Sequence, residues 1–456
     1  MITPGRRRFL GEGAWVAVGQ IMSAIGTLAG LRLLTTLLPP HVFGEVVLLG
    51  GIVLLANGLA ASPLMQGVLR FYPDAASANT VGMLRAVTQS YLVRSTLLTS
   101  SICLGGFLLY SAMAPVDRWL GVLIVALLIV EVGRQLELTM LNAARRQRAT
   151  AIWIALDAWA RPIAAWAIIE TVGATAISTM VGYVTASGVL LACLVYWRRH
   201  EDRGENDSAR VASLATGPVV EVGIMNLSVR FQESEDTLSK SLMRYSLPLL
   251  PLGVIGWLTG QADRYLVGGM IGVEEAGLYA ALYGIASRPF LMAGGMLEAW
   301  MRPIYYETVA AREVKREKRV LHMWMSAIIC ASLAGTGIFF FWHVEIAGIL
   351  LAEPYRANAG LMPWIAAGYG LLLVAQVYGR VCYAHHDTKA VLLSETIGCI
   401  VALVATVYGI SRFGLAGAAF AVPVYFSAQL ALAMILARRA EGRRPGIVLA
   451  GDRSSA

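Results

Sequence analysis

The sequence predicts an all-α polytopic membrane protein with about twelve transmembrane helices in two pseudo-symmetric lobes of six. Of its 456 residues, 57% are hydrophobic and only 14% are charged, whereas a soluble domain carries about 25% charged residues. Long apolar runs follow one another almost without interruption. The two halves of the chain repeat one another, and the basic residues concentrate in alternate connections.

A helix needs roughly 20 consecutive apolar residues to cross about 30 Å of hydrocarbon. Runs of this kind, separated by charged or turn residues, predict twelve spans. They cover approximately residues 13–38, 42–64, 86–112, 118–140, 149–169, 175–197, 244–271, 275–301, 320–350, 360–384, 388–410 and 414–437. The first run is too long for the hydrophobic region of a cleaved signal peptide, so we expect it to be retained as the first helix.

One long polar stretch separates the first six spans from the last six. We therefore expect an N-terminal six-helix lobe (1–197), a cytoplasmic linker (198–243), a C-terminal six-helix lobe (244–437) and a basic cytoplasmic tail (438–456). The linker begins RRHEDRGENDSAR, which has few apolar residues to bury, so we expect it to be flexible.

Lysine and arginine fall predominantly in the connections on one side of the predicted membrane. Only Arg118, Arg356 and Arg412 are assigned to the opposite side. By the positive-inside rule, this bias places both termini in the cytoplasm, with the chain in a bacterial inner membrane. The net charge of +8 then reflects topology, so we expect no nucleic-acid partner. The basic tail is expected to contact anionic membrane lipids.

An internal repeat relates the two halves. TLLPPHVFGEVVLLGGI aligns without gaps on GMIGVEEAGLYAALYGI, which pairs Gly44 with Gly277, and a shift of one residue pairs Arg32 with Arg264. Each half has an even number of spans, so the repeat is parallel, about an axis normal to the membrane. Transporters commonly use such repeats and bind substrate between the halves. The alternative is a duplication without transport, as in a scaffolding membrane protein.

Several segments carry a family resemblance. They are the basic start, LLPPHVFGEVVLL, PLMQGVLRFYP, YSLPLLP and QADRYLVGGMIGVEEAGLYAALYGI. Together they resemble the polysaccharide transporters, or Wzx-type oligosaccharide flippases, of the multidrug/oligosaccharidyl-lipid/polysaccharide (MOP) exporter superfamily. The resemblance implies a V-shaped pair of six-helix lobes that flips undecaprenyl-pyrophosphate-linked oligosaccharides to the periplasmic leaflet by alternating access, for surface or exopolysaccharide assembly. Its implied partners are this lipid-linked substrate and other polysaccharide-assembly proteins.

Two other functions also fit a polytopic membrane protein. A membrane-embedded polysaccharide polymerase or ligase needs a substantial periplasmic loop with catalytic residues, but every predicted outer loop is short. We find no glycine-rich nucleotide loop, metal-ligand spacing or nucleophile motif, and the five cysteines lie singly in apolar runs, so we expect neither enzyme activity nor a cofactor. A drug or cation antiporter of the same superfamily would favour carboxylates facing an apolar cavity, whereas arginines predominate here.

Ionisable side chains within the spans are costly unless they are paired or hydrated, and they are therefore functional candidates. We expect six of them to bind substrate: Arg32, Arg94, Arg134, Arg161, Arg264 and Arg288. They are spread from the cytoplasmic to the periplasmic third of the membrane, and guanidinium groups bind phosphate oxygens bidentately. In the alternative interpretation, Arg32 and Arg94 extend to the nearest headgroups.

Four carboxylates are candidates for ion coupling: Glu131, Asp157, Asp263 and Glu395. Glu131 and Arg134 are spaced i,i+3 and Asp157 and Arg161 i,i+4, so each pair can share a helix face. Such a pair either neutralises itself or exchanges protons or sodium. The sequence does not decide between these two roles. It also leaves open whether transport is coupled to a proton gradient, a sodium gradient or the membrane potential.

Overall fold

The structure, a computed structural model, describes residues 4–113, 117–216, 236–385 and 387–442. Within these residues the regular structure is entirely helical, without a strand. The chain divides into two compact units, Met1–Trp257 (unit 1) and Leu258–Ala456 (unit 2). The division between them falls inside one helix, and each unit is described by itself.

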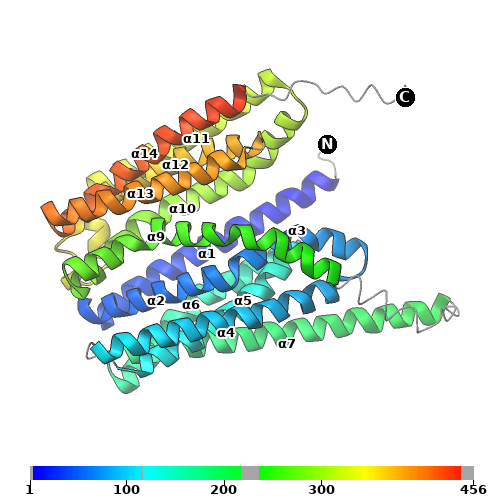
Figure 1. Ribbon diagram of the computed structural model, residues 1–456, viewed down its shortest axis with the longest axis horizontal. Helices are drawn as coiled ribbons and strands as arrows, with labels where there is room; N and C mark the ends of the chain where they lie inside the picture. Colours follow the sequence, from blue (N-terminus) through cyan, green and yellow to red (C-terminus); the bar gives the residue numbers. More distant parts are fainter. Residues whose placement is uncertain (1–3, 114–116, 217–235, 386, 443–456) are drawn as a thin grey trace. The chain divides into compact units, whose positions relative to one another are not determined.

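Unit 1 contains the helices drawn from blue to green in Figure 1. They are α1 (Pro4–Leu37), α2 (Pro40–Ala60), α3 (Ser62–Ser77), α4 (Val81–Met113), α5 (Trp119–Ala143), α6 (Gln147–Val172) and α7 (Ala176–Thr216). Residues 236–246 are also helical, and the 3-10 turn η1 (Leu247–Leu249) joins them to α9 (Leu250–Met270). Pro248 lies in this turn, where its missing N–H prevents a continuous α-helix.

Unit 2 contains the end of α9 and five long helices. They are α10 (Val273–Ala310), α11 (Val314–Leu350), α12 (Met362–Ala384), α13 (Thr388–Phe413) and α14 (Leu415–Gly442), with the short turns η2 (Glu353–Tyr355) and η3 (Ala359–Leu361) between α11 and α12. The Asp387 carboxylate accepts a hydrogen bond of 3.1 Å from the Ala390 N–H. This N-cap fixes where α13 begins.

The described helices confirm the predicted multi-pass membrane architecture. Ten of them are long and apolar enough to cross a membrane, and they match ten of the twelve predicted spans. The seventh and eighth predicted spans correspond to α9 and α10, which are long helices but fall outside these ten. Their polar residues, including the adjacent Asp263 and Arg264 in α9 and Arg288 in α10, lower their hydropathy.

The helix boundaries follow the predicted repeat. Leu37 and Met270 end α1 and α9, and Pro40 and Val273 begin α2 and α10; both pairs occupy equivalent positions in the repeat alignment. The helix pairings within each unit agree as well. In unit 1, α2 packs on α4 and α5, α4 on α5, and α7 on α5 and α6, while in unit 2, α10 packs on α11 and α12, α11 on α12, and α14 on α12 and α13.

Three glycines of α1 allow it to approach α6 closely. A Cβ atom at Gly19 would lie 2.7 Å from the Ala151 Cβ, and one at Gly30 would lie 2.7 Å from the Pro162 Cγ. At Gly26 the obstacle would be the Trp159 ring, at 2.8 Å. Small residues at such a contact stabilise helix pairs in membranes, because close packing replaces the hydrophobic driving force.

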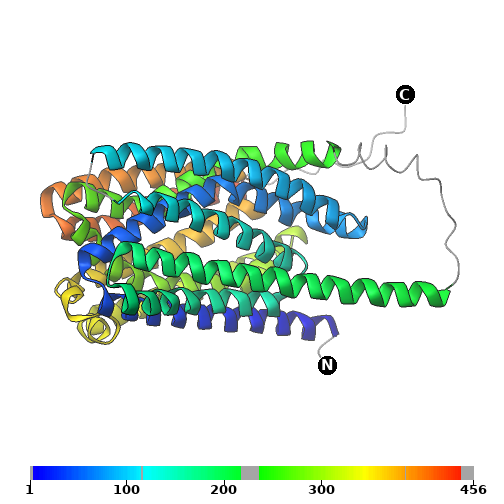
Figure 2. The same cartoon turned by 90° about the horizontal axis from the view of Figure 1, so that it is seen from below.

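The N-terminal part of the predicted linker is helical. Helix α7 was expected to end near residue 197, but it continues to Thr216, past the ends of the other unit 1 helices (Figure 2). The helical conformation of residues 198–216 was therefore not predicted from the sequence. Low apolar content does not by itself exclude a helix, because glutamate and arginine have good helix propensity. The middle of the predicted linker, 217–235, and most of the tail, 443–456, lie outside the described residues.

Two of the three arginines assigned to the outer side interact with helix C-termini. The Arg356 guanidinium donates to the carbonyl oxygens of Leu351 and Gly348 at 3.0 and 2.9 Å, at the end of α11. Arg412 lies in the last turn of α13. Positive charge is favourable at both positions because helix C-termini carry partial negative charge.

Cysteine accessibility tests the topology. In a chain without its five native cysteines, Ala357→Cys between η2 and η3 should react with a membrane-impermeant maleimide in intact cells, because this connection is expected outside. Ala311→Cys, between α10 and α11, should react only after the inner membrane is permeabilised. Equal labelling of both positions in intact cells would contradict the arrangement.

Candidate functional site: charged clusters within the helices

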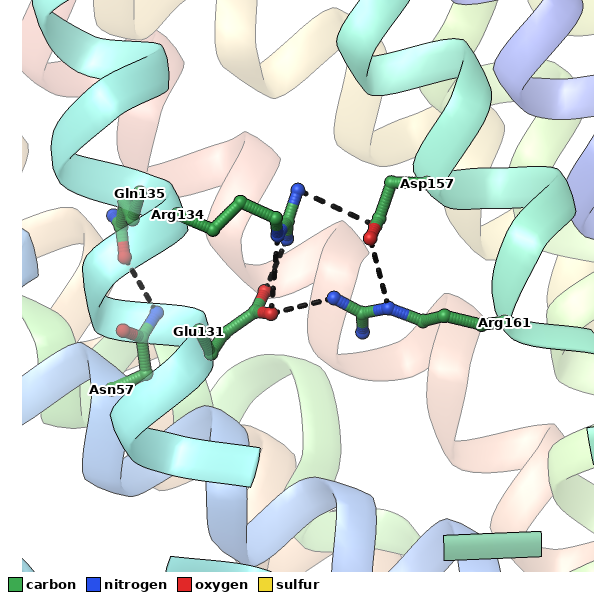
Figure 3. Close-up of polar contacts among 6 residues, drawn as sticks. All are labelled: Asn57, Glu131, Arg134, Gln135, Asp157 and Arg161. Atoms are coloured by element: carbon green, nitrogen blue, oxygen red, sulfur yellow. Dashed lines mark hydrogen bonds and ion pairs between the residues drawn. The ribbon is translucent and has the colours of Figure 1, made fainter. Parts of the chain in front are cut away.

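Four charged side chains at mid-span form a closed network between α5 and α6 (Figure 3). The network, here called the charge quartet, comprises Glu131, Arg134, Asp157 and Arg161. Arg161 Nη2 lies 2.5 Å from Glu131 Oε2, and Arg161 Nε lies 3.1 Å from Asp157 Oδ1. Arg134 pairs with Glu131 and also lies 3.4 Å from Asp157 through Nη1. Each charged group therefore contacts both groups of opposite sign.

The position of the quartet explains why it must be neutral. Glu131 lies at the midpoint of α5, and Asp157 and Arg161 lie on either side of the midpoint of α6. Their side chains are between 13 and 23% exposed. An unpaired charge at this depth costs about 2.5–3.5 kcal/mol or more, and two carboxylates with two guanidinium groups remove that cost by pairing.

A neutral polar contact connects the quartet's helix α5 to α2. Asn57 Nδ2 donates to Gln135 Oε1 at 2.7 Å, and Figure 3 places this pair beside the quartet. Asn57 Oδ1 is buried and has no hydrogen-bond partner among the described residues. Polar groups from three helices therefore meet at the centre of unit 1.

A second ionic cluster lies towards the C-terminal end of α5. Glu137 pairs with Arg85 from α4 and, at 3.1 Å, with Arg198 from α7. Its side chain is only 6% exposed, and one carboxylate here connects three helices. Sequence reasoning missed these contacts, because Arg85 and Arg198 are distant in the chain and are expected in cytoplasmic connections.

In unit 2, Asp263 and Arg264 are both buried near the C-terminal end of α9. Arg264 Nη1 donates to the Gly260 carbonyl at 2.7 Å and to Gln261 Oε1 at 2.6 Å. Its ion pair with Asp263 is longer, at 3.7 Å, and the other carboxylate oxygen accepts a hydrogen bond of 3.0 Å from the Tyr279 hydroxyl. The carboxylate is therefore shared between a cation and a phenol.

Aromatic rings surround the Arg264 guanidinium. It lies 4.4 Å from the centroid of the Tyr283 ring, and Tyr369 donates a hydrogen bond of 2.9 Å to the Tyr283 hydroxyl. A cation over an aromatic face is stabilised by the ring quadrupole, the more so when the pair is desolvated. Sequence reasoning missed these tyrosines. The i,i+4 spacing of Tyr279 and Tyr283 on α10 could have indicated that these two share one helix face.

Arg288 is placed near this group without a carboxylate partner. It is exposed, it interacts electrostatically with Arg264 and Tyr369, and it forms no ion pair with any described residue. The group of Asp263, Arg264 and Arg288 therefore carries one more positive than negative charge. The structure brings together two of the predicted substrate-binding arginines, one of which is balanced by an acid.

Glu395 belongs to a separate cluster in unit 2. It accepts a hydrogen bond from the Gln429 side chain and interacts electrostatically with Arg380. Arg380 in turn pairs with both carboxylate oxygens of Glu298, at 2.9 and 3.1 Å. This cluster joins α10, α12, α13 and α14, and it is distinct from the Asp263 group.

The remaining predicted residues, Arg32 and Arg94, lie outside the quartet. Arg32 is half-buried in α1. Arg94 is exposed on α4, with its guanidinium 6.0 Å from the centroid of the Tyr91 ring. Among the described residues, no group of three or more histidine, cysteine or acidic side chains could hold a metal ion.

The fold is similar to that of known membrane transporters. No protein-family model and no curated protein sequence matches the chain. An inward-facing multidrug resistance MATE family transporter of the MOP superfamily has a TM-score of 0.64 and 12% identity, with 94% of this chain and 95% of that chain covered. The lipid II flippase MurJ in an inward closed conformation also has a TM-score of 0.64, with 11% identity. The match covers 92% of this chain and 86% of that chain. A MOP superfamily transporter from Pyrococcus furiosus gives 0.61, with 13% identity and 95% of each chain covered.

These similarities extend over nearly the whole chain, and they define its class by fold. The protein is a multi-pass membrane protein with the fold of the MOP superfamily transporters. At 11 to 13% identity, MATE transporters and the lipid II flippase are about equally similar to it. The fold therefore does not distinguish between a drug exporter and a lipid flippase.

Neutrality of the quartet can be tested with a double-mutant cycle. Glu131→Gln and Arg161→Gln should each lower stability by about 3–5 kcal/mol, because each leaves a buried charge uncompensated. The double variant should recover at least half of the summed loss, since neutrality returns. Thermal unfolding in detergent measures these changes.

The exposed ion pair of Arg70 and Asp74, at 3.5 Å with side chains 60% and 74% exposed, supplies the control. Arg70→Gln should cost less than about 1 kcal/mol. Additive losses in the double quartet variant would show that the four charges act independently.

Proposed function

We propose that the chain is a flippase that moves lipid-linked oligosaccharide repeat units from the cytoplasmic to the periplasmic leaflet by alternating access. The proposed substrate is an undecaprenyl-pyrophosphate-linked glycan, and the proposed place is the inner membrane, with both termini in the cytoplasm. The fold supports a transporter rather than an enzyme. The choice of an anionic substrate depends on the charges inside the helices.

The observation that carries this choice is the uncompensated positive charge in unit 2. Arg288 has no acidic partner among the described residues, and its neighbour Arg264 has only Asp263, which also accepts from Tyr279. A pyrophosphate supplies the missing negative charge, and guanidinium groups can bind it bidentately. A transporter of cations would instead be expected to have excess carboxylates at this depth.

The contacts of the quartet favour a structural role over substrate binding. All four of its charges are satisfied internally, so a phosphate would have to displace a carboxylate from Arg134 or Arg161 in order to bind. Arg288 pays no such penalty. We therefore rank Arg288 and Arg264 above Arg134 and Arg161 as substrate-binding residues, and we assign the quartet to stabilising the contact of α5 with α6.

One observation favours the second candidate, a drug or cation antiporter. Asp263 is fully enclosed between Arg264 and Tyr279, and a buried carboxylate that also accepts from a phenol is a suitable site for proton exchange. Such exchange would also drive a flippase. The two functions therefore differ in substrate charge and in Arg288, while both can use Asp263 for coupling.

Export assays on Arg288 test the proposed function. In a strain lacking the native gene, Arg288→Gln should reduce glycan export about ten- to hundredfold, because one charge-assisted contact is worth about 1.5–3 kcal/mol. Arg288→Lys should retain part of the activity, because lysine keeps the positive charge but cannot form the bidentate contact of a guanidinium. Lipid-linked repeat units should accumulate in the cytoplasmic leaflet.

Arg412→Gln is the matched control. It removes a guanidinium that also lies near a tyrosine ring, 5.9 Å from the centroid of Tyr408, but at the end of α13 rather than within the span. Export should stay normal in this variant at equal membrane levels. Normal glycan export by Arg288→Glu, or loss of drug resistance without any change in glycan export, would favour the antiporter.

A further inference from the structure

Unit 1 contains an apolar groove that the proposed transport function does not use. It has a volume of about 240 Å³ and is lined by α2, α3, α4 and the segment around η1. This is smaller than the roughly 300–1,000 Å³ typical of pockets for drug-sized ligands. The lining is mainly leucine, alanine and proline, which suits a hydrocarbon chain.

The groove lies where two helices are interrupted. Helix α2 ends at Ala60, and α3 begins at Ser62 with Pro63 in its first turn; on the other side, η1 with Pro248 precedes α9. The Ser95 hydroxyl of α4 donates to the Ala60 carbonyl at 2.8 Å. The interruptions keep the helices from packing tightly along their whole length, and this leaves the hollow.

One buried polar atom in the lining has no partner. The Ser246 side chain lines the groove, and the residue is only 2% exposed. Its hydroxyl forms no hydrogen bond with any described residue. The Oγ atom is enclosed against α3, where a Cβ at Gly67 would lie 2.7 Å from it, so the chemistry of a ligand is indicated by Arg94 and not by Ser246.

The groove lining contains one charged side chain, that of Arg94. Arg94 lines it, is exposed, and has no carboxylate partner among the described residues. Its guanidinium lies over the Tyr91 ring, and the Tyr91 hydroxyl shares a hydrogen bond of 2.6 Å with Ser239. Tyr91 precedes Arg94 by about one turn, so this contact holds the guanidinium towards the N-terminal end of α4, which is expected to be cytoplasmic.

The surface beside Arg94 is apolar and accessible. Leu97 and Leu98 on α4 are 61% and 64% exposed, and Leu247 across the groove is 57% exposed. A transmembrane helix that presents such residues outward faces lipid. The molecules with direct access to the groove are therefore the bulk lipids of the membrane.

We propose that the groove binds an anionic glycerophospholipid from the cytoplasmic leaflet. The phosphate contacts the Arg94 guanidinium, and one acyl chain lies between α4 and the η1 segment. The lipid is a resident ligand of unit 1 and is separate from the transported substrate.

Lipid-binding measurements on the purified full chain test this proposal. The protein would be delipidated in detergent, given equal amounts of phosphatidylglycerol and phosphatidylcholine, and examined by native mass spectrometry. The wild-type chain should retain phosphatidylglycerol preferentially. Arg94→Gln should weaken this retention about tenfold or more, as expected for loss of one charge-assisted contact, while Arg94→Lys should keep part of it.

Two further variants separate the groove from the surface as a whole. Arg148→Gln removes another guanidinium over an aromatic ring, 4.9 Å from the centroid of Trp15, and should leave retention unchanged. Leu247→Trp fills the groove with an apolar side chain and should reduce retention without changing any charge. A phosphatidylglycerol with a photoreactive acyl chain should label peptides around residues 59–64 and 243–250.

Three results would overturn the proposal. They are equal retention of the two lipids by the wild-type chain, normal retention by Arg94→Gln, and labelling confined to peptides elsewhere. Exclusion of phosphatidylglycerol by undecaprenyl phosphate at equal concentration would also overturn it, in favour of the lipid carrier as the occupant. None of these readouts depends on export, so failure here leaves the proposed transport function standing.

Discussion

The need to neutralise charge inside the bilayer governs the centre of unit 1. The quartet places two acids and two arginines on neighbouring helices at mid-span, and each charge contacts both opposite partners. Two of these contacts lie within a helix and two connect α5 to α6. In a membrane, where apolar contact with a neighbouring helix offers little advantage over contact with lipid, such a network stabilises the contact between the two helices that carry it.

Unit 2 neutralises charge in a different way, although its helices pair in the same order. Arg264 has one carboxylate at 3.7 Å, two oxygen acceptors on its own helix and a tyrosine ring 4.4 Å away. Asp263 balances the charge of Arg264, whereas the nearby Arg288 has no carboxylate partner among the described residues. The repeated fold therefore contains one neutral centre and one centre that remains positive. A duplicated architecture has allowed the two halves to specialise electrostatically.

The sequence predicted the helices well because hydrophobic runs report them directly. It also identified both intrahelical pairs of the quartet, since i,i+3 and i,i+4 spacings place side chains on one face. The contacts of Arg161 with Glu131 and of Arg134 with Asp157 could not be predicted, because they depend on the rotation of α5 against α6. The same limitation hid the pairing of Glu137 with Arg85 and Arg198, and the tyrosines around Arg264. Composition also failed for residues 198–216, where a polar segment forms the end of α7.

The glycines of α1 have a consequence for how unit 1 can move. Gly19, Gly26 and Gly30 fit against α6 over several turns, and the Trp159 indole adds a hydrogen bond of 3.1 Å to the Met22 carbonyl. Sliding or twisting between the two helices would drive backbone into side chain. We therefore expect α1 and α6 to move together, so that Arg32 follows Arg161 whenever α6 shifts. We expect unit 1 to bend at its helix interruptions, at Ala61 and at η1.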